Sequence, residues 1–201
     1  MDRPLPPATL FDDLHGGFAP APEVAEWIRA AFLDEESPLY NPEHLHLKAA
    51  HVAVLWTTVE NGRHMRAIVG TAEMPLPQGG KWQKARGLYQ LRQWFGGEPD
   101  FLITLSAEYA AGASDVTWCA LVEHELYHCA HRRDAFGIPM FTRQGRPKFG
   151  IRGHDVEEFV GIVRRYGVKA AAGETAALVA AARGRPEIAA GEIRGLCGTC
   201  R

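Results

Sequence analysis

Two histidines four residues apart, His124 and His128, constrain the fold of this chain more than any other feature. Residues four apart in an α-helix lie on one face, so both imidazoles can reach the same metal ion. Glu125 lies between them, where its carboxylate can take a proton from a metal-bound water. We therefore predict a helix over residues 115–133, with Ser114 as its N-cap.

The other residues of this predicted helix support the same arrangement. At about 100° per residue, an apolar stripe lies on one side, and both histidines lie on the other side together with Thr117. The stripe consists of Trp118, Cys119, Val122, Leu126 and Cys129. Such a helix can bury its stripe in a core and present the histidines to a cleft. The alternative is a helix whose histidines form only ordinary surface contacts or hydrogen bonds.

A third metal ligand is expected, because a catalytic zinc usually has three protein ligands and an open position for water. His154 is the preferred candidate. It opens a helix predicted over 154–166, after a loop long enough to bring that helix back across the first. Gly161 in this helix would allow another backbone to approach closely. The alternative role for His154 is that of a helix-terminal residue without a metal.

Other residues after the first histidine pair are weaker candidates. His131 shares their face, but its Cα would lie roughly 10 Å along the helix axis from that of His124. Asp134 would need a glycine at position 131 to turn the chain, and histidine stands there. Glu157 or Glu158 would complete a set of two histidines and one glutamate.

Periodicity and turn signals predict an α+β fold in three parts. Residues 1–21 are read as an irregular N-terminal tail, 22–168 as the domain, and 169–201 as an Ala- and Gly-rich C-terminal helix and tail. Helices are predicted over 23–33, 82–95 and about 174–182. Strands are predicted over 50–59 and 65–71, joined as a hairpin through Asn61-Gly62, and over 101–105. We expect the last strand to lie at the edge of the cleft and to pair with an extended substrate.

The composition and the first residues of the chain bear on its binding partners and on the compartment in which it acts. The formal net charge is −2, so the overall balance does not call for nucleic acid or an anionic membrane. No apolar run approaches the ~18 residues that span a bilayer. The first residues lack the pattern of a secretory signal, which predicts a cytoplasmic protein. Cys119 and Cys129 are read as core thiols. Cys197 and Cys200 are read as part of a solvated tail or, alternatively, as half of a Cys₄ site across a dimer.

Basic residues cluster in the sequence around the predicted site. Such a rim can attract nucleic acid or an acidic protein, although a solvated face is the more common explanation. The residues are Arg132, Arg133, Arg143, Arg146, Lys148, Arg152, Arg164 and Arg165.

Three segments resemble the putative phage metallopeptidase family: residues 100–105, 120–129 and 145–159. The resemblance spans roughly residues 41–167. Its most specific part is also similar to the HGxxF segment that follows HExxH in SprT-like zinc peptidases, where the histidine is the third ligand. That part reads Gly153-His154-Asp155-Val156-Glu157-Glu158-Phe159.

The resemblance implies a small zincin-like domain of the SprT-like minigluzincin type. In such a domain a short, mostly antiparallel sheet packs against the HExxH helix and a following ligand helix. It further implies a Zn²⁺ ion held by His124, His128 and His154, and a protein or peptide substrate. A phage-encoded member would act in the host cytoplasm. SprT-like peptidases often act in association with DNA, which slightly favours nucleic acid as a partner of the basic rim.

The sequence thus predicts a zinc metallopeptidase with Glu125 as general base. Tyr109, Tyr127 and Tyr166 are candidates for stabilising the oxyanion. One alternative is another zinc-dependent hydrolase, such as a nuclease or amidase. A second is a non-catalytic module braced by zinc that binds protein or DNA. Glu125 argues against this module, because a structural site needs no general base.

Overall fold

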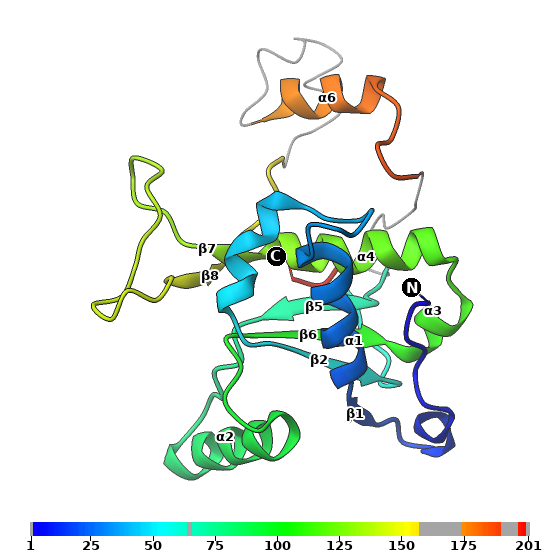
Figure 1. The fold of residues 1–201 in the computed structure, drawn as a ribbon. Coiled ribbons are helices and arrows are strands. Elements are labelled where there is room, and N and C mark those ends of the chain that lie inside the picture. Colours follow the sequence, from blue (N-terminus) through cyan, green and yellow to red (C-terminus); the bar gives the residue numbers. More distant parts are fainter. Residues whose placement is uncertain (1, 64–65, 157–173, 190–196, 200–201) are drawn as a thin grey trace.

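A four-stranded sheet with helices on both faces forms the centre of the protein (Figure 1). The computed structural model describes residues 2–63, 66–156, 174–189 and 197–199. The strands lie in the order β1 (Phe18–Pro20), β2 (Val52–Thr57), β6 (Phe101–Ser106) and β5 (Gly70–Glu73). β2 and β6 are parallel, and the other two pairs are antiparallel. The fold is therefore mixed α+β with a small sheet, as the sequence predicts.

The predicted hairpin between residues 50–59 and 65–71 is wrong, because β6 lies between these two segments. Val52 pairs with Phe101, and Gly70 pairs with Leu105 on the other side of β6. Asn61-Gly62 instead lies at the start of a small hairpin. Its strands, β3 (Gly62–Arg63) and β4 (Arg66–Ala67), have two residues each. All six residues of β2 are buried, which is typical of an interior strand with a neighbour on each side. β6 is also interior, so the edge strands of the sheet are β1 and β5, and the expectation that 101–105 lies at the edge is wrong.

The helices agree well with the sequence periodicity. The helices predicted over 23–33, 82–95 and near 174–182 are confirmed, the first with a π-helical second half. Of the helices described, none has the length and apolar content to cross a bilayer. The bounds are η1 (Ala8–Asp12), α1 (Pro22–Ile28), η2 (Arg29–Leu33), η3 (Pro42–Ala49), α2 (Lys81–Phe95), α3 (Ala107–Gly112), α4 (Asp115–His128) and α6 (Thr175–Arg183).

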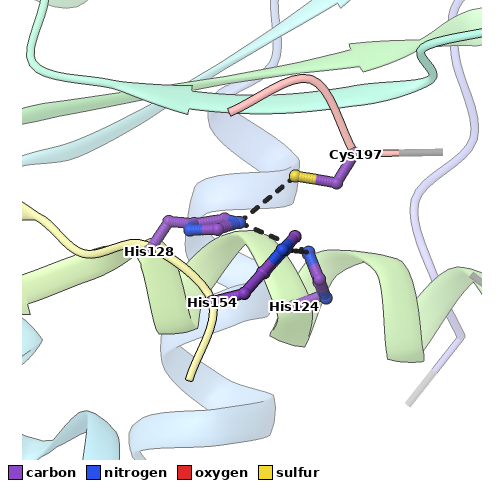
Figure 2. Close-up of side chains that lie close together, drawn as sticks. All are labelled: His124, His128, His154 and Cys197. Carbon is purple, nitrogen blue, oxygen red and sulfur yellow. Dashed lines mark hydrogen bonds between the residues drawn. The ribbon is translucent and has the colours of Figure 1, made fainter. Parts of the chain in front are cut away.

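The histidine-bearing helix, α4, begins as predicted but ends earlier. The Ser114 hydroxyl accepts a hydrogen bond from the Thr117 amide, as an N-cap does. The predicted continuation to residue 133 is wrong, because Cys129 opens β7 (Cys129–His131). This strand pairs with β8 (Phe149–Ile151), and the pairing brings the chain that follows β8 back to α4, where Figure 2 shows His154. The helix predicted over 154–166 lies largely outside the described residues.

Three tryptophans hold α4 against the sheet. The Trp118 ring lies 4.8 Å from that of Trp27 on α1 and 6.4 Å from that of Trp56 on β2, measured between centroids. Of the predicted apolar stripe, Trp118, Val122, Leu126 and Cys129 are buried in this core, and Cys119 packs against it partly buried, which confirms the apolar side of the helix. The opposite face of α4 is thereby fixed in space, and it carries the histidines.

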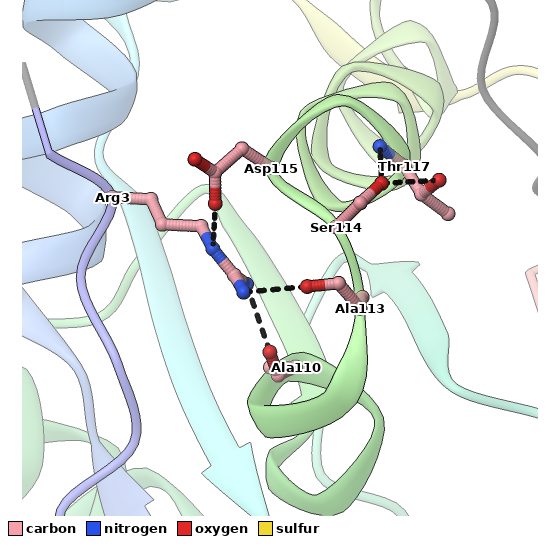
Figure 3. Close-up of polar contacts among 6 residues, drawn as sticks. All are labelled: Arg3, Ala110, Ala113, Ser114, Asp115 and Thr117. Carbon is pink, nitrogen blue, oxygen red and sulfur yellow. Dashed lines mark hydrogen bonds and ion pairs between the residues drawn. The ribbon is translucent and has the colours of Figure 1, made fainter.

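The N-terminal segment, for which the sequence predicts no regular structure, is attached to the start of α4 (Figure 3). It contributes η1 and β1, and Arg3 fixes its beginning. The Arg3 guanidinium donates to Asp115 Oδ1 at 2.7 Å and to the carbonyl oxygens of Ala110 at 2.8 Å and Ala113 at 2.7 Å. It also lies 5.5 Å from the centre of the Trp118 ring.

We expect Arg3→Ala to lower the free energy of unfolding by about 1–3 kcal/mol, because two carbonyl groups lose a charged donor. Asp115→Asn is the matched control and should cost less than about 1 kcal/mol, since the Asp115 side chain is 83% exposed. Urea unfolding of the two variants measures both values. Equal losses would show that the ion pair, and not the carbonyl contacts, holds the segment.

Candidate functional site

Three histidines and a cysteine converge beside α4 (Figure 2). His124 and His128 lie on the helix, His154 follows β8, and Cys197 comes from the C-terminal segment. Their ligand atoms all lie within 4.8 Å of one another. The Nε2 atom of His124 is 3.3 Å from that of His128 and 3.1 Å from that of His154. The predicted histidines are thus brought together, and the structure adds a sulfur atom.

The pairing of β7 with β8 orients one of these rings. The Arg152 amide donates to the His128 carbonyl at 2.9 Å, which continues the pairing beyond the strands. Nδ1 of His128 lies 2.7 Å from the Arg152 carbonyl oxygen, so this nitrogen donates and Nε2 is left as an acceptor facing the cluster. Histidines that bind metals are commonly oriented by such a bond to a backbone carbonyl. His154 is two residues further along.

The ionisation of the helix histidines also suits metal binding. Burial, followed by the neighbouring histidines, lowers the pKa of His124 to about 4. Burial likewise lowers the pKa of His128. Both rings are therefore neutral near pH 7, and neutral imidazole is the form that binds metals.

The spacing of the cluster fits a tetrahedral metal ion. Nitrogen atoms held about 2.1 Å from a tetrahedral zinc lie roughly 3.4 Å apart, close to the 3.1 and 3.3 Å found between the Nε2 atoms. Cys197 Sγ is 3.2 Å from Nε2 of His128. Imidazole nitrogen and cysteine sulfur are donors that zinc prefers. The residues present therefore fit a zinc ion.

Glu125 follows His124 on α4, is fully buried and contacts Cys197 of this cluster. Its Oε2 accepts a hydrogen bond of 2.9 Å from the Thr199 hydroxyl, whereas Oε1 has no hydrogen-bond partner among the described residues. Burial raises the pKa of Glu125 to about 7, against the opposing effect of contacts with Thr199 and Cys197. A buried carboxyl group with one unsatisfied oxygen can accept a proton from a molecule bound beside it.

Gly70 on β5 makes room for this carboxyl group. A Cβ atom at position 70 would lie 2.9 Å from Glu125 Oε1 and 3.0 Å from Leu121 Cδ1, closer than side chains pack. Glycine at this point of the edge strand therefore allows α4 to approach the sheet with the glutamate between them.

The alternative third ligands that the structure describes have other roles. His131 is on β7, and its Nε2 donates to the Met140 carbonyl oxygen at 2.7 Å. Asp134 Oδ1 accepts hydrogen bonds from the amides of Phe136 and Ile138 in a turn. Glu157 and Glu158 lie outside the described part of the chain.

The three tyrosines also differ in position. Tyr109 packs against the core, and Tyr127 lines a cavity of about 200 Å³ together with His124, His128 and His154. The Tyr127 hydroxyl accepts a hydrogen bond from Asn41 Nδ2 at 2.9 Å. Tyr166 is not among the residues that the structure describes. Of the candidate tyrosines in the described part of the chain, Tyr127 is therefore the one that shares a cavity with the histidines.

Cys197 and Thr199 are the site residues that sequence reasoning missed. Cys197 was expected in a solvated tail or in a site across a dimer, and it instead contacts His128. The one feature of the sequence that could have indicated Cys197 is that cysteine is a common zinc ligand. The residues around Cys197 in the sequence do not indicate that it lies beside α4.

The basic rim is partly neutralised. Arg152 forms an ion pair with Asp155, and Arg146 lies 3.5 Å from Asp100. Arg164 and Arg165 lie beyond the described segments. These two contacts reduce the net positive charge of the rim.

A helix that carries a histidine pair and a buried glutamate beside a third histidine is the arrangement of zinc hydrolases. The model of the family described as "Putative phage metallopeptidase" matches residues 25–183 of this chain. The chain belongs to this family, whose name indicates a metal-dependent peptidase. The matched region contains α4 and His154 and ends before Cys197. No curated protein and no solved structure matches the chain.

Proposed function

We propose that this protein is a zinc-dependent peptidase with a zincin-like domain over residues 22–168, in which His124, His128 and His154 bind the metal. Glu125 is its general base. The observation that carries the proposal is the Glu125 carboxyl group, buried beside three converging Nε2 atoms with Oε1 unsatisfied. The substrate is a protein or peptide, and a phage-encoded enzyme of this kind would act in the host cytoplasm.

The chemistry follows from what these side chains can do. Zinc bound here would polarise the substrate carbonyl and acidify a water molecule. Glu125 accepts the proton of the attacking water on Oε1 and passes it to the nitrogen of the leaving amine. The pKa of Glu125, about 7 without a metal, suits both transfers, and a nearby cation lowers it so that the base form prevails at neutral pH.

Two features next to the metal ligands suit a peptide. A larger cavity of about 820 Å³ shares Tyr127, Arg152 and Asp155 with the cavity above the histidines, and it offers room for substrate side chains. β5 is the edge strand nearest to α4, so an extended substrate backbone can pair with it. Tyr127 is the candidate oxyanion donor.

The alternatives are weaker on specific grounds. A nuclease or amidase would use the same histidines, but membership of a metallopeptidase family favours peptides. A zinc-braced binding module has no use for a buried glutamate whose pKa is raised towards neutrality.

Metal removal tests the proposal. We expect about one zinc ion per purified chain and hydrolysis of an unstructured protein such as casein, which o-phenanthroline abolishes and stoichiometric zinc restores. The assay uses the natural chain and Cys197→Ala, because the Cys197 sulfur lies among the ligand nitrogens. Absence of cleavage by both zinc-loaded proteins would refute a peptidase, and cleavage of DNA or RNA instead would identify the alternative hydrolase.

A further inference from the structure

Residues 197–199 lie along the edge of β5, at the place where an extended substrate would pair. Cys197 forms a parallel bridge with Gly70, and the Gly198 amide donates to the Gly70 carbonyl at 2.9 Å. The Ala72 amide donates to the Thr199 hydroxyl at 2.6 Å. These contacts use backbone groups of β5 that face away from β6, so the segment covers part of the free edge of β5 through an isolated bridge.

Glycine at position 198 permits this close approach. A Cβ atom there would lie 2.5 Å from Ile68 Cγ2 and 2.8 Å from Thr71 Cγ2. A larger residue would push the segment away from β5 and Cys197 away from the histidines. The sequence Cys-Gly-Thr is thus matched to this position.

The Cys197 side chain completes the ligand cluster (Figure 2). Its Sγ is 3.2 Å from Nε2 of His128 and accepts a hydrogen bond of 3.3 Å from the Thr199 amide. Three histidines alone leave the fourth position of a tetrahedral zinc open, as catalysis requires. With Cys197 added, all four positions are filled.

Thr199 forms a hydrogen bond with the proposed general base, Glu125, at the same time. Its hydroxyl accepts from the Ala72 amide and donates to Glu125 Oε2 at 2.9 Å. The segment therefore contacts the strand that would bind a substrate, the position that would bind water and the residue that would accept the proton. The family match ends at residue 183 and assigns nothing to these residues.

We propose that residues 197–199 form an inhibitory segment of the same chain. The Cys197 thiolate is the fourth zinc ligand, its thiol proton having passed to solvent, and the backbone blocks the edge of β5. When the segment leaves, water takes the fourth position and a peptide can pair with β5. This inference rests on the proposed peptidase function, and it adds how the enzyme is held inactive.

Cobalt substitution tests the ligand without relying on activity. We expect the full-length Co²⁺ protein to show a sulfur-to-cobalt charge-transfer band in the near ultraviolet that is lost in Cys197→Ala. Cys200→Ala, which changes the thiol three positions further along the sequence, and Cys119→Ala, which changes a thiol packed against the core, should keep the band. A natural protein without the band, or a band that survives Cys197→Ala, overturns the proposal.

Peptide cleavage by the zinc proteins tests the inhibition. Suppose that the segment covers the site in at least roughly nine-tenths of the molecules. Cys197→Ala then raises kcat/KM at least about tenfold, because the fraction of molecules with an open site rises towards one. Thr199→Val should raise it by less, and Cys200→Ala should leave it unchanged. A Cys197→Ala protein that loses zinc and unfolds would make Cys197 a structural ligand and overturn the inhibitory role.

The two proposals fail in different ways. Equal kcat/KM for the natural chain and Cys197→Ala overturns the inhibitory segment and leaves the peptidase intact. A cobalt–sulfur band without peptide cleavage by either zinc protein overturns the peptidase itself, and the inhibitory role with it.

Discussion

Glu125→Gln is expected to lower kcat/KM for peptide cleavage by about 10²–10⁴, the usual contribution of a general base. Glutamine has the shape of glutamate and can still accept the hydrogen bond that Thr199 donates to Oε2, but it cannot take a proton from water. Zinc content and the free energy of unfolding should therefore change little. The measurement is best made in the Cys197→Ala background, where the site is open.

Glu123→Gln is the matched control for this change. Glu123 lies two residues earlier on α4 and loses the same charge in the substitution, but its Oε1 accepts a hydrogen bond of 2.8 Å from Asn41. It is not part of the ligand cluster. We expect the kcat/KM of Glu123→Gln to stay within about a few fold of that of the parent protein. Activity that survives Glu125→Gln, or that falls equally in both variants, would contradict the assigned base.

Local features of the fold could be predicted from the sequence, because they depend on neighbours in the chain. The N-cap at Ser114 follows from a hydroxyl placed just before the first helical turn, and the buried side of α4 follows from helical periodicity; both are confirmed. α2 ends at Phe95, and its C-cap, Gly96, has a φ of 70°, the left-handed conformation that glycine favours.

Strand neighbours could not be predicted in the same way. Asn61-Gly62 is a strong turn signal, but a turn does not determine whether the segments beside it pair with each other. β2 pairs in parallel with β6, about 50 residues further on, through contacts that no local pattern shows. The choice depends on burial of both faces of β2, which is a property of the assembled sheet.

The end of α4 shows tertiary contacts overriding periodicity. Cys129 continues the apolar stripe and would suit another helical turn, but in the structure it pairs with Ile151 in β7–β8. That pairing gives His131 a partner in the Met140 carbonyl and removes it from the metal cluster. It also brings Arg152 to His128, so the same event that ends the helix positions His154.

The position of Cys197 depends on contacts with residues that are distant in the sequence. The residue is fixed by backbone bonds to Gly70 and by a side chain that meets His128, both far away in the chain. Its Cys-Gly-Thr context is too short to show periodicity. The sequence could therefore supply the three histidines and the glutamate, but not the fourth ligand or its contact with the base.

His154→Ala is expected to weaken zinc binding at least about 100-fold, because loss of even an outer-shell partner commonly costs 10–100-fold in affinity. Peptide cleavage should fall with the bound metal. The variant belongs in the Cys197→Ala background, since the Cys197 sulfur would otherwise remain as a third ligand beside His124 and His128. Competition with a chromophoric chelator gives the zinc dissociation constant directly.

His131→Ala separates the two candidates for the third ligand. It removes an imidazole from the strand that follows α4, but the Nε2 atom lost is the one that donates to Met140. Zinc affinity should therefore remain that of the parent, with at most about 1–2 kcal/mol of stability lost with the hydrogen bond. Added zinc should raise the Tm of this variant as it does that of the parent, and should raise that of His154→Ala much less at the same zinc concentration. The reverse result would place the third ligand on β7, and the geometry argued for His154 would be wrong.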